Sequence, residues 1–114
     1  METVHQHCRA LPGAITLIDE ADGPVLRLSG EIDSSVVDAW QAAGRATDEP
    51  DDQAAVAVDV SAATFLDCRG LQLLVRATER ARRSGRLPEL RNPTRTVRRM
   101  VEIVGAGTLF ATVG

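Results

Sequence analysis

The stretch from Val56 to Arg83 constrains the fold of this 114-residue chain more than any other. It begins with an apolar, β-branched run over 56–60 and ends with an amphipathic run over 70–83 that opens with a glycine. These patterns predict a buried strand, a short loop and a helix. In open α/β sheets, functional sites form at the carboxyl ends of strands. The loop residues Asp67, Cys68, Arg69 and Gly70 are therefore the first candidates for a functional site.

Length and composition indicate one folded domain, because 44% of the residues are hydrophobic and 25% are charged. No apolar run approaches the roughly 20 residues of a membrane span. The first residues also lack the basic and then apolar layout of a signal peptide. We expect a cytoplasmic protein with no membrane partner, a flexible tail over residues 1–12 and one domain over 13–114. Cys8 and Cys68 should then be free thiols.

Charge is distributed unevenly along the sequence. Residues 1–68 hold three Arg and 13 acidic residues, a net charge of −10, whereas residues 69–114 hold ten Arg and three acidic residues, a net charge of +7. We expect the two halves to interleave in the fold, with solvated Arg side chains on the helices. Nucleic-acid binding by the basic half is the alternative. The scarcity of aromatic residues, which would stack on single strands, argues against it.

Periodicity and turn residues predict the elements along the chain. Strands are expected over 14–18, 25–29, 56–60 and 87–91, with a last short strand over 109–113, and helices over 34–46, 70–83 and 94–104. The short link between the first two strands indicates an antiparallel hairpin. Asp33 and Thr94 are suited to cap helices. Pro88 places the fourth strand at a sheet edge or marks its start. The order predicts an α/β fold with a mixed sheet and crossover helices.

Each predicted helix has an apolar stripe that should face the core. The stripe residues are Val36, Val37, Trp40 and Ala43 in the first helix, Leu71, Leu74, Val75, Thr78 and Ala81 in the second, and Val97, Met100, Val101 and Val104 in the third. The arginines of the second helix lie on a different face, and Glu79 can pair with Arg83. Gly85 is expected to end that helix.

Three kinds of catalytic or metal chemistry fit the sequence poorly. A helix N-terminus and Arg69 would favour a Cys68 thiolate, but the chain passes directly into a Leu-rich helix without an amide cradle. Asp33, Asp59 and Asp67 fall near predicted strand ends, yet phosphoaspartate chemistry commonly needs a lysine, and the chain has none. We interpret them as two helix caps and a loop anchor. The tail residues His5, His7 and Cys8 are a weak metal set. A small non-enzymatic binding module without a cofactor is therefore expected.

Five short segments in this order resemble the STAS domain, specifically the stand-alone bacterial anti-sigma factor antagonists. The segments are Leu28–Asp33, Val58–Ser61, Phe65–Leu71, Asn92–Pro93, and Val97–Met100 leading to Leu109–Phe110. The resemblance implies a mixed sheet of four to five strands with helices packed mainly on one face. It also implies a partner, which is an anti-sigma factor of the serine-kinase type. The partner-binding residues implied are Asp33, Ser34, Asp67, Cys68, Arg69, Gly70 and Leu71.

The chain departs from the family at the position of the regulatory hydroxyl. In the family the kinase phosphorylates a Ser or Thr just before the helix glycine, and the added charge ends the docking. Here that position is Arg69, preceded by Cys68. Three hypotheses stay open. The chain is an antagonist that is always competent, or one switched by oxidation of Cys68, or a signalling scaffold or nucleotide- or small-ligand-sensing module with no sigma-factor role.

Overall fold

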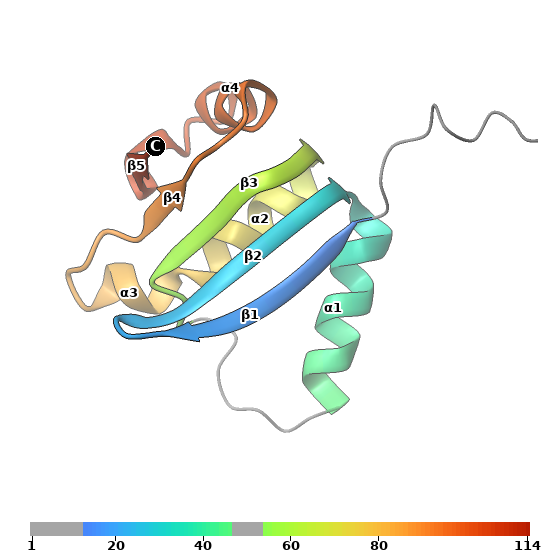
Figure 1. The fold of residues 1–114 in the computed structure, drawn as a ribbon, viewed down its shortest axis with the longest axis horizontal. Helices are drawn as coiled ribbons and strands as arrows, with labels where there is room; N and C mark the ends of the chain where they lie inside the picture. The colour runs from blue at the N-terminus through green and yellow to red at the C-terminus, as the bar shows by residue number, and fades with distance from the viewer. Residues whose placement is uncertain (1–12, 47–53) are drawn as a thin grey trace, which may run out of the picture.

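The computed structural model describes residues 13–46 and 54–114, which form a five-stranded sheet in the order β1-β2-β3-β4-β5 (Figure 1). The strands are β1 (Ala14–Glu20), β2 (Gly23–Ile32), β3 (Ala57–Leu66), β4 (Glu89–Arg91) and β5 (Ala111–Val113). The helices are α1 (Ser34–Ala46), α2 (Cys68–Ala77), α3 (Glu79–Arg83) and α4 (Arg95–Ile103), followed by a 3₁₀ turn over Gly107–Leu109. β1 is antiparallel to β2, and all other neighbouring strands are parallel. The predicted mixed α/β sheet is confirmed.

The N-terminal hairpin and α1 agree with the sequence prediction. Gly23 adopts φ 134° at the turn between β1 and β2, a conformation that glycine allows at little cost. The Asp33 carboxylate accepts a hydrogen bond from the Val36 amide at 3.2 Å, which starts α1 at the predicted residue. Val37 is fully buried, whereas Ala43 on the predicted stripe is exposed.

The predicted loop before α2 is wrong, because residues 61–66 continue β3. The register between β2 and β3 shifts twice, between Arg27 and Ser29 and between Gly30 and Glu31. Each shift adds one residue to β3, as in a β-bulge. The buried side chains of this half therefore recur every third residue and lack the period of two that identifies a strand. They are Val60, Ala63 and Leu66.

The predicted single helix over 70–83 is also wrong, since the helix begins at Cys68 and breaks at Thr78 into α2 and α3. Thr78 is fully buried, and its hydroxyl donates to the Leu74 carbonyl at 2.7 Å. This bond competes with regular helix geometry. The Arg82 guanidinium donates to the Val75 carbonyl at 2.5 Å and to the Thr78 hydroxyl at 2.6 Å. These bonds satisfy polar groups at the break and explain why it is stable.

The C-terminal elements refine two predictions. β4 begins one residue after Pro88 and lies between β3 and β5, so the expectation of an edge strand is wrong and the proline instead marks the start. The Thr94 hydroxyl accepts from the Val97 amide at 3.3 Å and caps α4 as predicted. Val104, expected in the buried stripe of this helix, is 47% exposed. It follows the last helical residue and therefore leaves the core-facing stripe.

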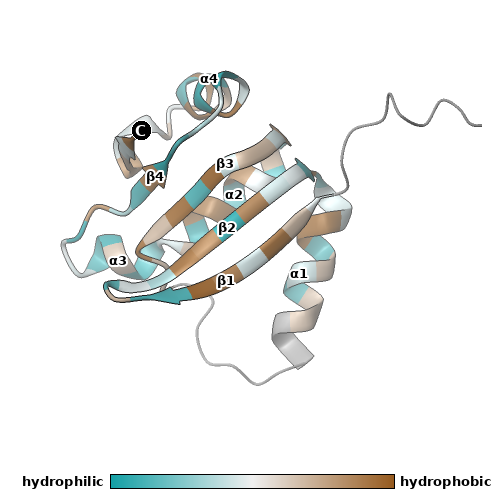
Figure 2. Ribbon diagram, in the orientation of Figure 1, coloured by the Kyte–Doolittle hydropathy of each residue, from teal (hydrophilic) through white to brown (hydrophobic). Residues whose placement is uncertain are grey.

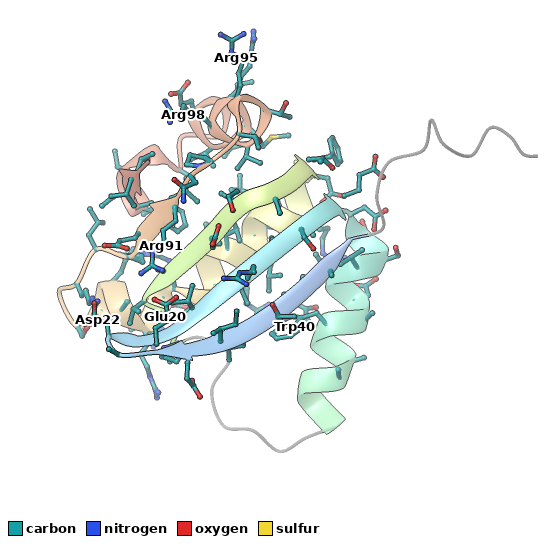
Figure 3. All side chains as sticks on the ribbon, viewed as in Figure 1. Glu20, Asp22, Trp40, Arg91, Arg95 and Arg98 are labelled. Carbon is teal, nitrogen blue, oxygen red and sulfur yellow. The ribbon has the colours of Figure 1, made fainter. Side chains whose placement is uncertain are left out.

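The helices leave one face of the sheet open. In Figure 1, α2 lies behind β2 and β3, and α1 lies beside the edge strand β1. The ribbon of the three long strands mixes apolar and polar residues along its length (Figure 2). Polar side chains on the open face pair across strands, as Figure 3 shows for Glu20 and Arg91, whose charged atoms lie 3.1 Å apart. Arg91 also contacts Glu89 at 2.8 Å. The apolar core therefore lies between the sheet and the helices.

The two oppositely charged halves of the chain interleave in part, because α2 of the basic half packs behind β2 and β3 and next to α1 of the acidic half. The strands follow chain order across the sheet, so the N-terminal elements lie at one side and α4 with β5 at the other (Figure 1). Three ion pairs join residues of the two halves. Arg69–Asp38 and Arg86–Asp22 are exposed, whereas the Arg91 side chain of the Arg91–Glu20 pair is only 25% exposed. Among the described residues, α4 and its exposed arginines lie at the side of the sheet away from β1.

Candidate functional site

Two neighbouring parallel strands end side by side at the candidate corner. Ile32 at the end of β2 is in register with Leu66 at the end of β3. An aspartate follows each strand and precedes a helix. The Asp67 amide donates to the Ile32 carbonyl at 3.2 Å, and the Asp67 carboxylate accepts from the Gly70 amide at 2.9 Å. The structure thus brings the predicted residues Asp33 and Asp67 to one edge of the sheet, and both cap helices as expected.

Asp33 is held as a carboxylate by local hydrogen bonds. The Ser35 hydroxyl donates to it at 2.7 Å, and the Val36 amide donates at 3.2 Å. These hydrogen bonds, the one from Ser35 first, lower the pKa of Asp33 below its ordinary value. The group is therefore fully ionised near neutral pH. Ser34, the next candidate residue, is exposed at the start of α1.

Gly70 allows α2 to approach the ends of both strands closely. A Cβ at this position would lie 2.6 Å from Leu66 Cδ1 and 3.1 Å from the Ile32 carbonyl oxygen. Gly70 is buried, and Leu71 is only 5% exposed. Among the candidate residues, Gly70 and Leu71 therefore hold α2 against the strand ends and do not form the surface of the corner. The side chains that reach its surface are those of Ser34 and Cys68 and, partly, those of Asp33, Asp67 and Arg69.

Arg69 is paired with an acidic residue that the sequence did not single out. Its guanidinium lies 2.5 Å from the carboxylate of Asp38 in α1, and both side chains are largely solvated. α1 and α2 begin at adjacent strand ends, so their first turns lie next to each other. The pair could have been predicted from the sequence only if β2 and β3 were already known to be neighbours. The corner consequently presents a neutralised cation at position 69.

Cys68 connects the corner to an apolar groove. It is an exposed, free thiol at the first position of α2. The groove has a volume of about 410 Å³ and runs along α2, with residues of the α4 end as its other wall. Its lining consists of Cys68, Leu71, Gln72, Val75 and Arg76 from α2, opposite Val104 and Ala106. Sequence reasoning missed this groove because it assigned Val104 to the core.

Asp59, the third candidate aspartate, is not at this corner. It lies in the interior of β3, because that strand continues to Leu66. Burial raises the pKa of Asp59, but hydrogen bonds from Ser61 and the nearby Arg27 outweigh it, so that the net shift is downward. Within the described ranges 13–46 and 54–114, no group of three or more His, Cys, Asp or Glu residues is placed to hold a metal ion. The tail residues His5, His7 and Cys8 lie outside those ranges.

The fold corresponds to a known family. The family model described as "Mlab, STAS domain" matches residues 16–111. The chain belongs to the STAS domain family. This confirms the family resemblance stated from the sequence, including the mixed sheet with helices mainly on one face.

None of the helices that the structure describes has both the length and the apolar character needed to cross a membrane.

Solved structures of STAS proteins are similar over most of the chain. The anti-sigma factor antagonist SpoIIAA in its unphosphorylated form matches with a TM-score of 0.64 and 23% identity, covering 89% of this chain and 89% of that chain. An anti-sigma factor antagonist from Mycobacterium paratuberculosis matches with a TM-score of 0.64 and 25% identity, covering 89% of this chain and 85% of that chain. A comparison with the sequences of curated proteins finds no match. At these identities the likeness to SpoIIAA establishes the fold.

Proposed function

We propose that this STAS domain is an anti-sigma factor antagonist-like regulator of transcription, which acts in the cytoplasm by partner switching rather than as an enzyme. The partner would be an anti-sigma factor of the serine-kinase type. The observation that supports this most directly is the corner itself, where two aspartate-capped helices start at adjacent ends of parallel strands. The structural similarity to anti-sigma factor antagonists also supports the proposal.

Docking would use the exposed part of the corner. Ser34 and Cys68 offer small side chains, and Asp33 offers a fixed negative charge. Gly70 and Leu71 would act by holding α2 against the strand ends, because both are buried. A rigid frame with small surface side chains suits a protein interface, since little conformational entropy is lost on binding.

Arg69 removes the usual means of switching such a surface off. It has no hydroxyl to accept a phosphate, so a kinase could not add the repulsive charge at this position. Its pairing with Asp38 at 2.5 Å also lowers the cost of covering it, because a buried cation without a partner would be strongly unfavourable. We therefore expect docking to persist while the kinase is active, unless the neighbouring thiol controls it.

Direct binding measurements test this function. Candidate anti-sigma kinases should bind the purified chain at micromolar concentration or tighter in calorimetry. Ser34→Glu should weaken that binding by about tenfold or more, because it adds a charge within the corner. Ser84→Glu is the matched control, because Ser84 is an exposed serine at the end of α3, beyond the opposite end of α2. If no candidate kinase binds with or without reductant, the antagonist proposal fails.

Mild peroxide distinguishes the two forms of control that we consider. If the Cys68 thiol is the switch, oxidation should abolish kinase binding, reductant should restore it, and Cys68→Ser should be insensitive to both. If the antagonist is always competent, peroxide should leave the affinity unchanged. Mapping of modified thiols identifies the responsible cysteine. An unreactive Cys68 would exclude the redox form and leave the constitutive one.

A further inference from the structure

The groove along α2 exposes apolar surface that the fold does not cover. Val104 on its wall is 47% exposed, and its neighbour Ile103 is 73% exposed. Val75, on the opposite wall, is only partly buried. Contiguous exposed apolar side chains around a concave surface are typical of interaction sites. This surface extends beyond the corner, although Cys68 and Leu71 contribute to both.

The dimensions of the groove fit a short helical segment. Its lining follows α2 from Cys68 to Arg76, which spans about 12 Å at the helical rise per residue. Two turns of a helix laid into such a groove would place apolar side chains at positions i, i+3, i+4 and i+7 against Leu71, Val75 and Val104. A flat polar partner would leave these apolar atoms in water.

The charges around the groove define the second property of its occupant. Arg76 lines the groove and forms no ion pair with another residue in the part of the chain that the structure describes. The same holds for Arg95, Arg98 and Arg99, which are exposed on α4, and Figure 3 shows Arg95 and Arg98 directed away from the sheet. Arg69, by contrast, is already neutralised by Asp38. The groove therefore has one cation in its lining, and α4, whose end forms the other wall, carries three exposed arginines against one exposed acid, Glu102, so that the site complements acidic groups.

We propose that this groove binds an amphipathic helix of a partner protein, with an apolar face and acidic residues on its flank. The apolar face would cover Val75 and Val104, and an acidic side chain would pair with Arg76. This site does not depend on phosphorylation chemistry or on the sigma-factor role. It would give the chain a second contact surface next to the corner.

A designed peptide tests the proposal without knowledge of the natural partner. The probe is a helical peptide of about 14 residues with Leu at i, i+3, i+4 and i+7 and Glu on its flanks. Two control peptides carry Lys in place of Glu, or a scrambled order without an apolar face. Binding to the isotope-labelled full chain is followed by amide chemical shifts and by calorimetry. Shift changes should centre on Val75 and Val104, and the Lys peptide should bind about tenfold more weakly or worse.

Paired variants locate the site. Val104→Glu should weaken binding of the acidic peptide by about tenfold or more. Leu87→Glu is the matched control and should leave this binding unchanged, because Leu87 is similarly exposed, at 49%, but lies outside the groove lining. Ile103→Ser is a second, milder variant that should weaken binding even if the first variant is unstable. Arg76→Glu should reverse the preference toward the Lys peptide, and Arg83→Glu is its control.

Three results would overturn the proposal. These are equal binding of the acidic, Lys and scrambled peptides, no binding of the acidic peptide at millimolar concentration, or shift changes outside the groove. Sedimentation of the wild-type chain adds a fourth. If the chain forms a dimer that Val104→Glu makes monomeric, the occupant of the groove is a second copy of the chain.

Discussion

Gly70 shows how one residue determines the geometry of the corner. A Cβ there would lie 2.6 Å from Leu66 Cδ1 and 3.1 Å from the Ile32 carbonyl oxygen, so Gly70→Ala must push α2 away from the strand ends. Overpacking of this kind costs about 1–3 kcal/mol, despite the better helix propensity of alanine. Urea denaturation should show this loss. Gly107→Ala is the control, because a methyl group added there would meet nothing within 4 Å, and it should be nearly neutral.

Acid should destabilise the fold through Asp33 and Asp59. Both pKa values are lowered in the folded state, so the unfolded chain binds more protons as the pH falls. The stability that these carboxylates contribute is present above the unfolded pKa of about 4 and is lost as the pH decreases through the folded values. The urea midpoint of the wild type should therefore decrease when the pH is lowered below about 4.

The variant with Asp33→Asn and Asp59→Asn isolates this effect. Asparagine keeps a side-chain oxygen for the α1 cap but does not titrate in this range. Its urea midpoint should fall less steeply with acid than that of the wild type. An equally steep decline in both proteins would show that other groups control the acid transition.

At the scale of elements, Arg82 links the α2–α3 break to the C-terminal segment. Its guanidinium donates to Val75 and Thr78, and it lies 5.7 Å from the ring centroid of Phe110. Arg82→Met should keep much of the packing but lose these bonds, each worth about 1.5–3 kcal/mol where a charged group takes part. We expect a loss of stability in this range overall.

Hydrogen exchange locates the effect of that substitution. The amides around the break and around Phe110 should exchange faster in Arg82→Met, while β1 and β2 should be protected as in the wild type. Arg83→Met is the matched control, since the Arg83 side chain forms an exposed ion pair with Glu79, worth about 0–1 kcal/mol. A uniform change across the sheet would contradict a local role for Arg82.

Sequence patterns identified those elements whose signals are local. The hairpin turn, the Asp33 cap of α1 and the Thr94 cap of α4 depend on neighbouring residues, and all three were predicted correctly. The second half of β3 was missed because its two bulges set its buried residues three apart. The break at Thr78 was missed because threonine at helical spacing fits the apolar stripe.

The parts of the site that sequence patterns did not reveal are those that depend on long-range contacts. Asp67, Cys68 and Gly70 were selected for the corner as neighbours in sequence, and the structure brings Asp33 beside them. The Arg69–Asp38 pair joins residues 31 positions apart and requires α1 and α2 to start at adjacent strands. Their role in partner binding stays a prediction from the family resemblance.

At the scale of the molecule, the sequential strand order places α4, with its exposed Arg95, Arg98 and Arg99, at the side of the sheet away from β1. Local patterns could not predict this placement, because another strand order would have put α4 next to different elements. An acidic partner should therefore approach the α4 end faster at low salt, since electrostatic steering is screened by ions. Reversing the charge of Arg95, Arg98 and Arg99 to Glu should lower the association rate constant of the acidic helical peptide more than it raises the dissociation rate constant.

Stopped-flow measurements over a range of salt concentrations check this steering. The association rate constant of the wild type should fall with salt, whereas that of the charge-reversed variant should not. The same variant should keep its thermal midpoint, because the three arginines are exposed. A salt dependence that survives the reversal would place the steering charges elsewhere.

The most direct test of the proposed function compares the wild type with Arg69→Ser in the presence of a bound anti-sigma kinase and ATP. Both proteins should bind the kinase before ATP is added. The variant should then accept one phosphate on the introduced hydroxyl and dissociate, whereas the wild type should gain none at the corner and stay bound. Phosphorylation and release of the wild type, or failure of both proteins to bind any anti-sigma kinase, would contradict the proposed function.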